Sequence, residues 1–446
     1  MFAYKGELAM PKKKTALTIE ERLQQALVPA EEQPYEVPEN WVWVRLGNFI
    51  DLLRGVSYKK HDVHNEKMEN DCLILRGGNI IEGGLDLNAD NVYVDKSLVS
   101  EAQLIRKNDI IIVSSTGSVK VIGRAGLAFY DYNDVAFGAF LTLARPKNGC
   151  NKSFVDLFFQ SFLYRQSIRE LASGVNINNI RSEYITNMTF PLPPLSEQQR
   201  IVERIEELFA KLDEAKERLQ EVADSFAVRK AAILHKAFTG ELIGKKIEQL
   251  VPLESLVDLI KIGPFGSALH ESDYIENGIP LVNPKHIVQQ HIVPQSKISI
   301  SEEKAEELSS YRLKANDIVL GRRGEMGRCA PVSAREENWI CGTGSMIIRL
   351  KEEYDARLYS LILGSQATVT YLENSAVGST LKNLNEKIVR KIPVPQFDIE
   401  EQHEIVRLID DLLAREHKAQ QATEQALPSI DPMKKSILAR AFRGEL

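Results

Sequence analysis

The sequence has few of the residues that build cofactor and redox sites. It holds four cysteines in 446 residues, and no two of them have the CxxC spacing of a metal or redox site. Scattered single thiols are typical of buried, reduced cysteines in a cytosolic protein. The four are Cys72, Cys150, Cys329 and Cys341.

Catalytic and nucleotide-binding motifs are missing as well. The sequence contains no HExxH, no (N/D)PP(Y/F), no glycine-rich methyl-donor loop after a strand and no GxxxxGK[ST] loop. The nearest candidate for the last, "GELIGKK" at 240–246, has the wrong spacing. A carboxylate–lysine group in "LDEAK" (212–216) lies on a predicted helix and is interpreted as its solvated face. These absences favour binding over chemistry and predict no cofactor or metal in this chain.

Long apolar runs are also absent. No segment approaches the roughly 20 apolar residues that cross a bilayer, and "KKK" at 12–14 is not followed by the apolar part of a secretory signal. We therefore expect a cytoplasmic protein without membrane contact. With 446 residues, 43% hydrophobic and 26% charged, the chain is expected to form two or more globular domains.

The sequence does contain an internal repeat. "AFTGEL" at 237–242 returns 204 residues later as "AFRGEL" at 441–446. At the same offset, "EQQRIVERIEELF" (197–209) returns as "EQHEIVRLIDDLL" (401–413). Such collinear matches indicate a tandem duplication with pseudo-two-fold symmetry. Two looser matches are "KNDIII" (107–112) with "ANDIVL" (315–320), and "ASGVNINNI" (172–180) with "AVGSTLKNL" (376–384).

A third copy of the short phrase, "AYKGEL", occupies residues 3–8 and precedes any long helix. One interpretation is that the repeat is circular, so that the N-terminus begins where the helix of a unit would end. The other is a chance match or an artificial remnant. Between this copy and "WVWVRLGNFIDLL" lies an extra stretch with a helix candidate near 18–27.

Each repeat has a strand-rich part and a helical part. Short β-branched runs cut by Gly and Asn predict strands and turns, with some helix near 154–171. Residues 196–238 contain no proline or glycine and predict one long helix with Ser196 as its N-cap. Its apolar residues alternate three and four apart and form one narrow seam, which needs a partner helix. The predicted seam is Ile201, Ile205, Leu208, Leu212, Leu219, with Ala215, Val222, Phe226 and Ile233 continuing it.

The second repeat offers a weaker partner helix. Its seam is Ile405, Ile409 and Leu412, followed by Ala419 and Ala426, while Glu416 and Thr423 fall at seam positions. Pro428 and Pro432 are predicted to break it before "KKSILARAF". We expect the two helices to pair antiparallel within the chain. The alternative is that each helix packs on its own globular domain.

Charge is distributed unevenly along the repeats. The helical segments 196–224 and 398–424 carry net charges of −4 and −5, together −9, so the rest of the chain is net +3 against the overall −6. In contrast, 104–124 and 311–328 are each net +3 and include glycine-rich loops, such as "GRRGEMGR" at 321–328. Basic loops of this kind suit phosphate and base-edge contacts. A solvated surface loop is the alternative, but the recurrence in both repeats favours a ligand.

Two further pairs of loops combine Gly with Ser, Thr, Asn, Lys or His. They are "GVSYKKHD" (55–62) with "GPFGSALHES" (263–272), and "SGVNINNIR" (173–181) with "VGSTLKNLN" (377–385). Each is interpreted either as a ligand-contacting loop or as a simple turn or cap.

The segment "PLPPLSEQQRIVERIEELFAKLDEAK" followed by "AFTGEL", together with "PVP", "EEQHEIV" and "AFRGEL", resembles the DNA specificity subunit of type I restriction–modification enzymes. "GPFGSALHESDYIENGIPLVNPKHI" (263–287) resembles the start of a target-recognition domain in that family. The resemblance covers essentially the whole chain.

The resemblance implies an α+β fold in which two target-recognition domains are joined by two long antiparallel coiled-coil helices. It implies five segments: an N-terminal segment with a short helix (1–40), target-recognition domain 1 (41–190), a central helical region (191–242), target-recognition domain 2 (243–392) and a C-terminal helical region (393–446). Each recognition domain would read one half of a bipartite, asymmetric DNA sequence, and the helices would set the spacing of the halves.

The resemblance also implies a non-catalytic subunit. Its partners would be double-stranded DNA, two modification subunits that use S-adenosylmethionine to methylate adenine, and restriction subunits that use ATP and Mg²⁺ for cleavage. No cofactor is expected in this chain.

The residues predicted to contact DNA come from the loops named above. In the first repeat they are Lys59, Lys60, Arg76, Asn79, Ser115, Lys120, Arg124 and Asn179. In the second they are Ser267, His270, Lys285, His286, Arg322, Arg323, Arg328, Lys382 and Asn383. Arg and Lys favour guanine edges and Asn favours adenine, although phosphate contacts are commoner.

Two other function classes are open to this sequence. One is a coiled-coil scaffold with two protein-interaction domains, which gives no reason for basic loops in register. The other is an enzyme with a concealed nuclease site, which the missing motifs disfavour.

Overall fold

The computed structural model describes residues 18–118, 120–173, 179–375 and 383–446. The chain divides into two compact units. Unit 1 is the chain up to Arg218 together with the C-terminal segment Leu427–Leu446, and unit 2 is Leu219–Ala426. Each unit therefore contains one strand-rich domain and part of each long helical region. The five-segment division of the chain stays a prediction, because these units cut across it.

Unit 1 is built on a four-stranded antiparallel sheet with the strand order β2-β10-β7-β8. One of its two inner strands, β7, has the sequence "IIIV" and is buried along its whole length, as expected for β-branched residues inside a sheet. The strands are β2 (Ile50–Arg54), β7 (Ile110–Val113), β8 (Ala125–Leu127) and β10 (Leu141–Pro146).

A second sheet of unit 1 has the order β6-β3-β9, in which β3 and β9 are parallel. Two strand pairs, β1-β11 and β4-β5, complete the domain. The bounds are β1 (Val42–Arg45), β3 (Asp71–Leu75), β4 (Ile80–Ile81), β5 (Gly84–Leu85), β6 (Val92–Asp95), β9 (Val135–Phe137) and β11 (Thr189–Leu192). The helices are α1 (Ile19–Ala26), α2 (Lys152–Gln160), α3 (Phe162–Ser173) and α4 (Ser182–Thr186). α1 confirms the helix predicted near 18–27, and α2 with α3 the helix predicted near 154–171.

Unit 2 repeats this plan, as the duplication predicts. Its sheets have the orders β13-β21-β18-β19 and β17-β14-β20, the latter with β14 and β20 parallel, and its strand pairs are β12-β22 and β15-β16. The strands are β12 (Val251–Pro252), β13 (Val257–Ile262), β14 (Ile279–Val282), β15 (Ile287–Val288), β16 (His291–Ile292), β17 (Ser299–Ile300), β18 (Asp317–Gly321), β19 (Cys329–Pro331), β20 (Ile340–Cys341), β21 (Ser345–Leu350) and β22 (Pro393–Val394). The helices are α6 (Glu302–Glu307), α7 (Ala356–Leu363), α8 (Gln366–Ser375) and α9 (Glu386–Arg390).

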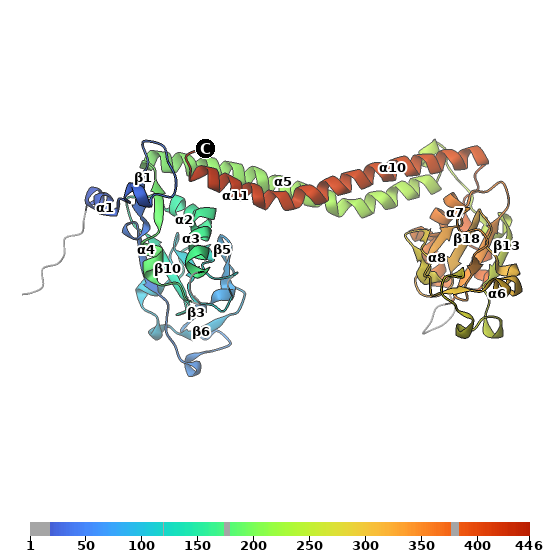
Figure 1. Ribbon diagram of the computed structural model, residues 1–446, viewed down its shortest axis with the longest axis horizontal. Helices are drawn as coiled ribbons and strands as arrows, with labels where there is room; N and C mark the ends of the chain where they lie inside the picture. The colour runs from blue at the N-terminus through green and yellow to red at the C-terminus, as the bar shows by residue number, and fades with distance from the viewer. Residues whose placement is uncertain (1–17, 119, 174–178, 376–382) are drawn as a thin grey trace, which may run out of the picture. The chain divides into compact units, whose positions relative to one another are not determined.

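The long helices are α5 (Leu195–Phe238), α10 (Ile399–Ala426) and α11 (Ile430–Ala441). In unit 1, α11 lies alongside the first half of α5, and Asp213 pairs with Lys434 at 2.5 Å and Lys216 with Asp431 at 3.3 Å (Figure 1). In unit 2, α10 lies alongside the second half of α5, where Arg229 pairs with Glu416 at 2.9 Å. In unit 1 the residue number falls on α11 as it rises on α5, and in unit 2 Lys245, just beyond α5, pairs with Glu401, so the number falls on α10 in the same way and the antiparallel pairing is confirmed. Asp213 and Lys216 of "LDEAK" thus each form an ion pair with a residue of α11.

The seam departs from the heptad prediction at its ends and at three inner positions. Ile201 and Ile205 lie in the core of unit 1, and Ile405 and Ile409 in that of unit 2. The alternative prediction, that each helix packs on its own globular domain, therefore holds at the helix starts. Along the rod, Leu208, Leu212, Leu219 and Leu412 are half-buried, whereas Ala215, Val222 and Ala419 are exposed.

Polar seam residues and prolines have local explanations. Glu416 is the partner of Arg229, and the hydroxyl of buried Thr423 donates to the carbonyl of Ala419 at 2.9 Å. The helix is interrupted by a 3₁₀ turn at Leu427–Ser429, as predicted for Pro428. The break predicted at Pro432 is wrong, because this residue lies in the first turn of α11, where no helical N–H is lost. The predicted N-cap Ser196 is also wrong, since α5 begins at Leu195 and Ser196 lies inside its first turn.

The glutamine of the repeated "EQ" ties each helix start to its domain. The Gln198 side chain donates to the carbonyl of Pro193 at 2.8 Å and accepts from the backbone N–H of Asn151 at 2.8 Å. Gln402 likewise donates to the carbonyl of Phe397 at 3.0 Å and accepts from the N–H of Asp355 at 2.7 Å. Both side chains are buried, so their satisfied amides fix how the helix leaves the domain.

Candidate nucleic-acid interface

Two loop regions that are far apart in sequence meet in both units. In unit 1, Ser115 forms a β-bridge with Asn179, and the N–H of Ile180 donates to the carbonyl of Ser114 at 2.7 Å. In unit 2, Arg323 forms the equivalent bridge with Asn383, and the N–H of Leu384 donates to the carbonyl of Arg322 at 3.0 Å. Four of the predicted DNA contacts are thereby brought together in pairs.

In unit 1, Ser115 of this bridge lines a cleft with a volume of about 630 Å³. Three predicted contacts, Arg76, Ser115 and Arg124, line it. One Nη of Arg76 pairs with Asp90 at 2.9 Å in an exposed ion pair, and one Nη of Arg124 donates to the carbonyl of Ile80 at 3.2 Å. The cleft therefore presents two oriented guanidinium groups and hydroxyls, which suit phosphate oxygens and base edges.

In unit 2 the corresponding loop concentrates three arginines. Arg322 is half-buried, and its Nε donates to the carbonyl of Leu384 at 3.2 Å. Burial, and then the neighbouring charge of Arg323, lower the pKa of Arg322. Arg328 donates to the carbonyl of Pro284 at 3.3 Å, as Arg124 does to the equivalent turn of unit 1. Arg323 is exposed, so it is the arginine of this loop best placed for an external phosphate.

Two predicted contacts, Asn79 and His286, occupy equivalent turns and do not face a ligand. Asn79 is fully buried, where its Oδ1 accepts from the N–H of Arg76 at 2.7 Å and its Nδ2 donates to the carbonyl of Asp86 at 2.9 Å. His286 is buried and its Nδ1 accepts from the N–H of Asn283 at 3.2 Å. Both side chains lock the turn before a short hairpin, and this structural role disfavours them as base readers.

The remaining predicted contacts are mostly exposed side chains on turns. Within the described part of the chain, none of the lysines among them forms an ion pair. Lys59 and His270 start equivalent 3₁₀ turns, where each backbone N–H donates to an aspartate three residues on. Ser267 lies in the turn Gly266–Ala268. Lys382 lies outside the described residues. The exposed cations are Lys59, Lys60, Lys120 and Lys285.

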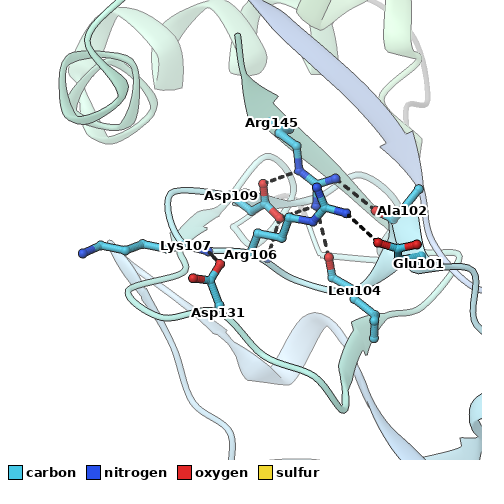
Figure 2. A network of polar contacts seen from close by, with 8 residues as sticks. All are labelled: Glu101, Ala102, Leu104, Arg106, Lys107, Asp109, Asp131 and Arg145. Carbon is cyan, nitrogen blue, oxygen red and sulfur yellow. Dashed lines mark hydrogen bonds and ion pairs between the residues drawn. The ribbon is translucent and has the colours of Figure 1, made fainter. Parts of the chain in front are cut away.

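The aspartate of the repeated "ND" pair, Asp109 just before β7 and Asp317 at the start of β18, forms a buried ion pair within its own domain. Figure 2 shows the Arg145 guanidinium between Asp109 and the carbonyls of Ala102 and Leu104, with Lys107 pointing away. Arg145 makes a bidentate contact to buried Asp109 at 2.8 and 2.6 Å, which raises the pKa of Arg145. Arg349 holds Asp317 in the same way, at 2.7 Å for both contacts.

Several cations in the basic segments are also neutralised locally. Arg106 lies near Glu101, Arg312 pairs with Glu302 and Glu306, and Arg328 with Glu325. The net charge of +3 therefore overstates the charge that each segment offers to a ligand.

Two aromatic residues of the unit 1 cleft were missed by the sequence analysis. Tyr58 and Phe140 line it beside Arg76 and Arg124. Tyr58 lies in a loop that was singled out for its lysines. The signal for Phe140 was available in "FGAF" (137–140), where an apolar residue follows glycine at a turn that ordinarily takes polar residues.

Among the described residues, no group of three or more His, Cys, Asp or Glu is placed to hold a metal. All four cysteines are free and buried, and burial raises the pKa of their thiols. No helix in the described ranges is both long enough and apolar enough to span a membrane.

Comparison with known proteins agrees with this arrangement. The family model described as "Type I restriction modification DNA specificity domain" matches residues 38–224 and again 254–427. The EcoKI specificity subunit of Escherichia coli K12 is 29% identical over 425 residues, covering 92% of this chain and 90% of that protein. The StySPI specificity subunit of Salmonella potsdam is 28% identical over 422 residues, with the same coverage.

Solved structures show the same fold. The HsdS subunit of Thermoanaerobacter tengcongensis matches with a TM-score of 0.64 and 19% identity, over 93% of this chain and 100% of that one. A structure described as showing complex assembly and conformational transition of the type I R-M system matches with a TM-score of 0.57 and 20% identity, over 93% and 100% of the two chains. Because the specificity-domain model matches both repeats and together most of the chain, this protein belongs to the family of type I restriction–modification DNA specificity subunits.

Proposed function

We propose that each unit of this chain reads one half of a bipartite DNA target. The observation that carries the proposal is the repeated loop pairing. The Ser115–Asn179 and Arg323–Asn383 bridges place a basic loop against an Asn-bearing loop at the end of the same sheet in both units. Two equivalent basic surfaces fit two half-sites better than one continuous site. The loops differ in sequence, so the half-sites should differ too.

As a specificity subunit, the chain recognises DNA sequence and leaves catalysis to its partners. We propose that it binds two modification subunits, one for each repeat, and that restriction subunits join them. S-adenosylmethionine, ATP and Mg²⁺ would then be bound by those partners in the cytoplasm. The adenine to be methylated would be flipped into a pocket of the modification subunit.

We further propose that the helix pairs set the spacing of the half-sites. The 44 residues of α5 span roughly 66 Å at about 1.5 Å per residue, and one turn of DNA is about 34 Å. A rod of this length exceeds one DNA turn.

A footprint of the chain assembled with its modification subunits tests this function. We expect protection of one split sequence, selected from a random DNA pool, with two protected halves separated by an unread spacer. Protection that does not depend on sequence, or its absence, would contradict the proposal and favour the scaffold alternative.

A further inference from the structure

Phe140 is exposed although its backbone is held firmly. It lies in the turn between β9 and β10, and the residue is 70% exposed. Its carbonyl accepts from the N–H of Ser114 at 3.1 Å, from the N–H of Ser115 at 3.0 Å and from the Ser114 hydroxyl at 3.0 Å. Three bonds to one carbonyl fix the position from which the ring projects. The ring itself adds little to the core, since most of it stays in water.

The surroundings of this ring are those of a nucleic-acid site. Phe140 lines the same cleft as Arg76, Arg124 and the Ser115–Thr116 hydroxyls. An apolar ring beside guanidinium groups is the combination that contacts bases while the cations hold the backbone.

A second exposed phenylalanine projects from the equivalent junction of unit 2. In unit 1, Gly55 and Gly138 approach so closely that a Cβ on Gly55 would lie 2.1 Å from the carbonyl oxygen of Gly138. Gly263 and Gly342 show the same 2.1 Å approach. Phe140 follows the second glycine of its pair by two residues, and Phe265, which is 67% exposed, follows the first glycine of its pair by two.

We propose that Phe140 makes an apolar contact to the bases of the half-site read by unit 1, and that Phe265 does so for the half-site read by unit 2. The contact is either with a thymine methyl group or a wedge against a base step. This inference rests on the proposed function, because it names residues that read the half-sites.

The test uses the full chain assembled with its modification subunits and the duplex that the wild-type complex selects from a random pool. We expect Phe140→Ala to lower affinity for that duplex about tenfold, the loss of one good base contact. Sequence preference should relax in one half-site only, and Phe265→Ala should relax the other. The salt dependence of binding should not change, because no charge is lost.

Phe129→Ala is the matched control. Phe129 is also an exposed phenylalanine of unit 1, at 54%, but it follows β8 near Asp109, at the opposite end of β7 from Phe140. It should bind like the wild type. Phe140→Leu, which keeps an apolar side chain, should fall between the wild type and Phe140→Ala.

Two further arms identify the contact. Deoxyuridine in place of thymine should reproduce the loss in the wild type if a methyl group is contacted. A 2-aminopurine reporter should show unstacking that Phe140→Ala abolishes if the ring is a wedge. Affinity of Phe140→Ala within twofold of wild type, or equal loss on random DNA, would overturn the inference. If the wild-type complex selects no split sequence at all, the proposed function fails instead.

Discussion

At the residue scale, the adjacent Arg322 and Arg323 in the loop after β18 have different roles. Arg322 is half-buried and bonded to the carbonyl of Leu384, so it joins two loops of unit 2. Arg323 is exposed beside it and makes no ion pair with any residue that the structure describes. Removing both at once would combine a folding defect with a binding defect, which is why the two should be separated.

We predict that Arg323→Ala weakens DNA binding similarly for all sequences and reduces the salt slope of log affinity by about 1, as for one lost phosphate contact. Titration of affinity against salt measures this. Arg335→Ala is the control, since Arg335 is exposed but follows β19 at the other end of the sheet. A slope equal to that of the wild type would remove Arg323 from the interface.

A buried carboxyl gives unit 1 a pH-dependent stability. Burial raises the pKa of Asp156 to about 7, partly offset by the hydrogen bond from Gln160 at 2.6 Å. In the unfolded chain an aspartate has a pKa of about 3.9, so between about pH 4 and pH 7 the folded state binds the extra proton. The contribution of Asp156 to stability is therefore greatest below about pH 4 and is lost as the pH rises to about 7.

We predict that Asp156→Asn stabilises unit 1 at pH 8, by on the order of 2–4 kcal/mol, and changes little near pH 4. The amide keeps an acceptor for Gln160 without a buried charge. Urea unfolding of wild type and variant at several pH values measures the difference. Glu183→Gln, at an exposed carboxylate of the same unit, should be neutral at every pH. A difference that does not depend on pH would refute the assignment.

At the element scale, the C-terminal helix belongs to the core of unit 1. Leu438, Ala441 and Phe442 pack with α2 residues such as Phe154, whose ring centroid is 5.1 Å from that of Phe442. In unit 2 the equivalent positions Leu234, Ala237 and Phe238 pack in the same way from α5. "AFRGEL" thus does for unit 1 what "AFTGEL" does for unit 2, whereas the circular interpretation of the repeat stays a prediction. "AYKGEL" itself lies outside the described residues.

We predict that Leu438→Ala destabilises unit 1 by about 2–4 kcal/mol, because it leaves a cavity where the buried leucine side chain was packed. Denaturant unfolding followed by a probe in unit 1 measures the loss. Met433→Ala removes an exposed side chain from the same helix and should cost under about 0.5 kcal/mol. Equal effects of the two substitutions would show that the helix is not part of this core.

At the scale of the whole molecule, recognition should be modular. Exchanging residues 41–190 for those of another family member should change only one half of the DNA sequence that is selected. The incoming domain must keep aromatic residues at the positions of Phe154 and Phe158, since both pack on Phe442, which lies outside the exchanged segment. Selection from a random pool measures the outcome. A change in both halves would contradict a separate reader in each unit.

Much of this organisation was predictable from local pattern. The duplication, the long helices and their antiparallel pairing follow from repeated motifs and apolar spacing, which depend on neighbouring residues. The individual site residues were less predictable. Asn79 and His286 are polar side chains in turns that contain Gly or Pro, so sequence alone does not distinguish a turn lock from a base reader. Arg328 and Arg323 look alike in "GRRGEMGR", yet only the fold places Glu325 and Pro284 against Arg328.

The sequence by itself determined the two repeats, the helical segments and the family, because these are written in periodicity and in motifs that need no distant partner. Tertiary structure decided which ends of the helices join a globular core, which cations are neutralised and which loops share a surface. The joined helix ends and the shared loop surface depend on residues far apart in the chain, such as Ser115 with Asn179 and Tyr35 with the Phe442 carbonyl at 2.8 Å. The neutralised cations pair with carboxylates nearby in sequence, but the fold sets which of these pairs form. Burial and pairing are properties of a three-dimensional neighbourhood, and the fold alone creates it.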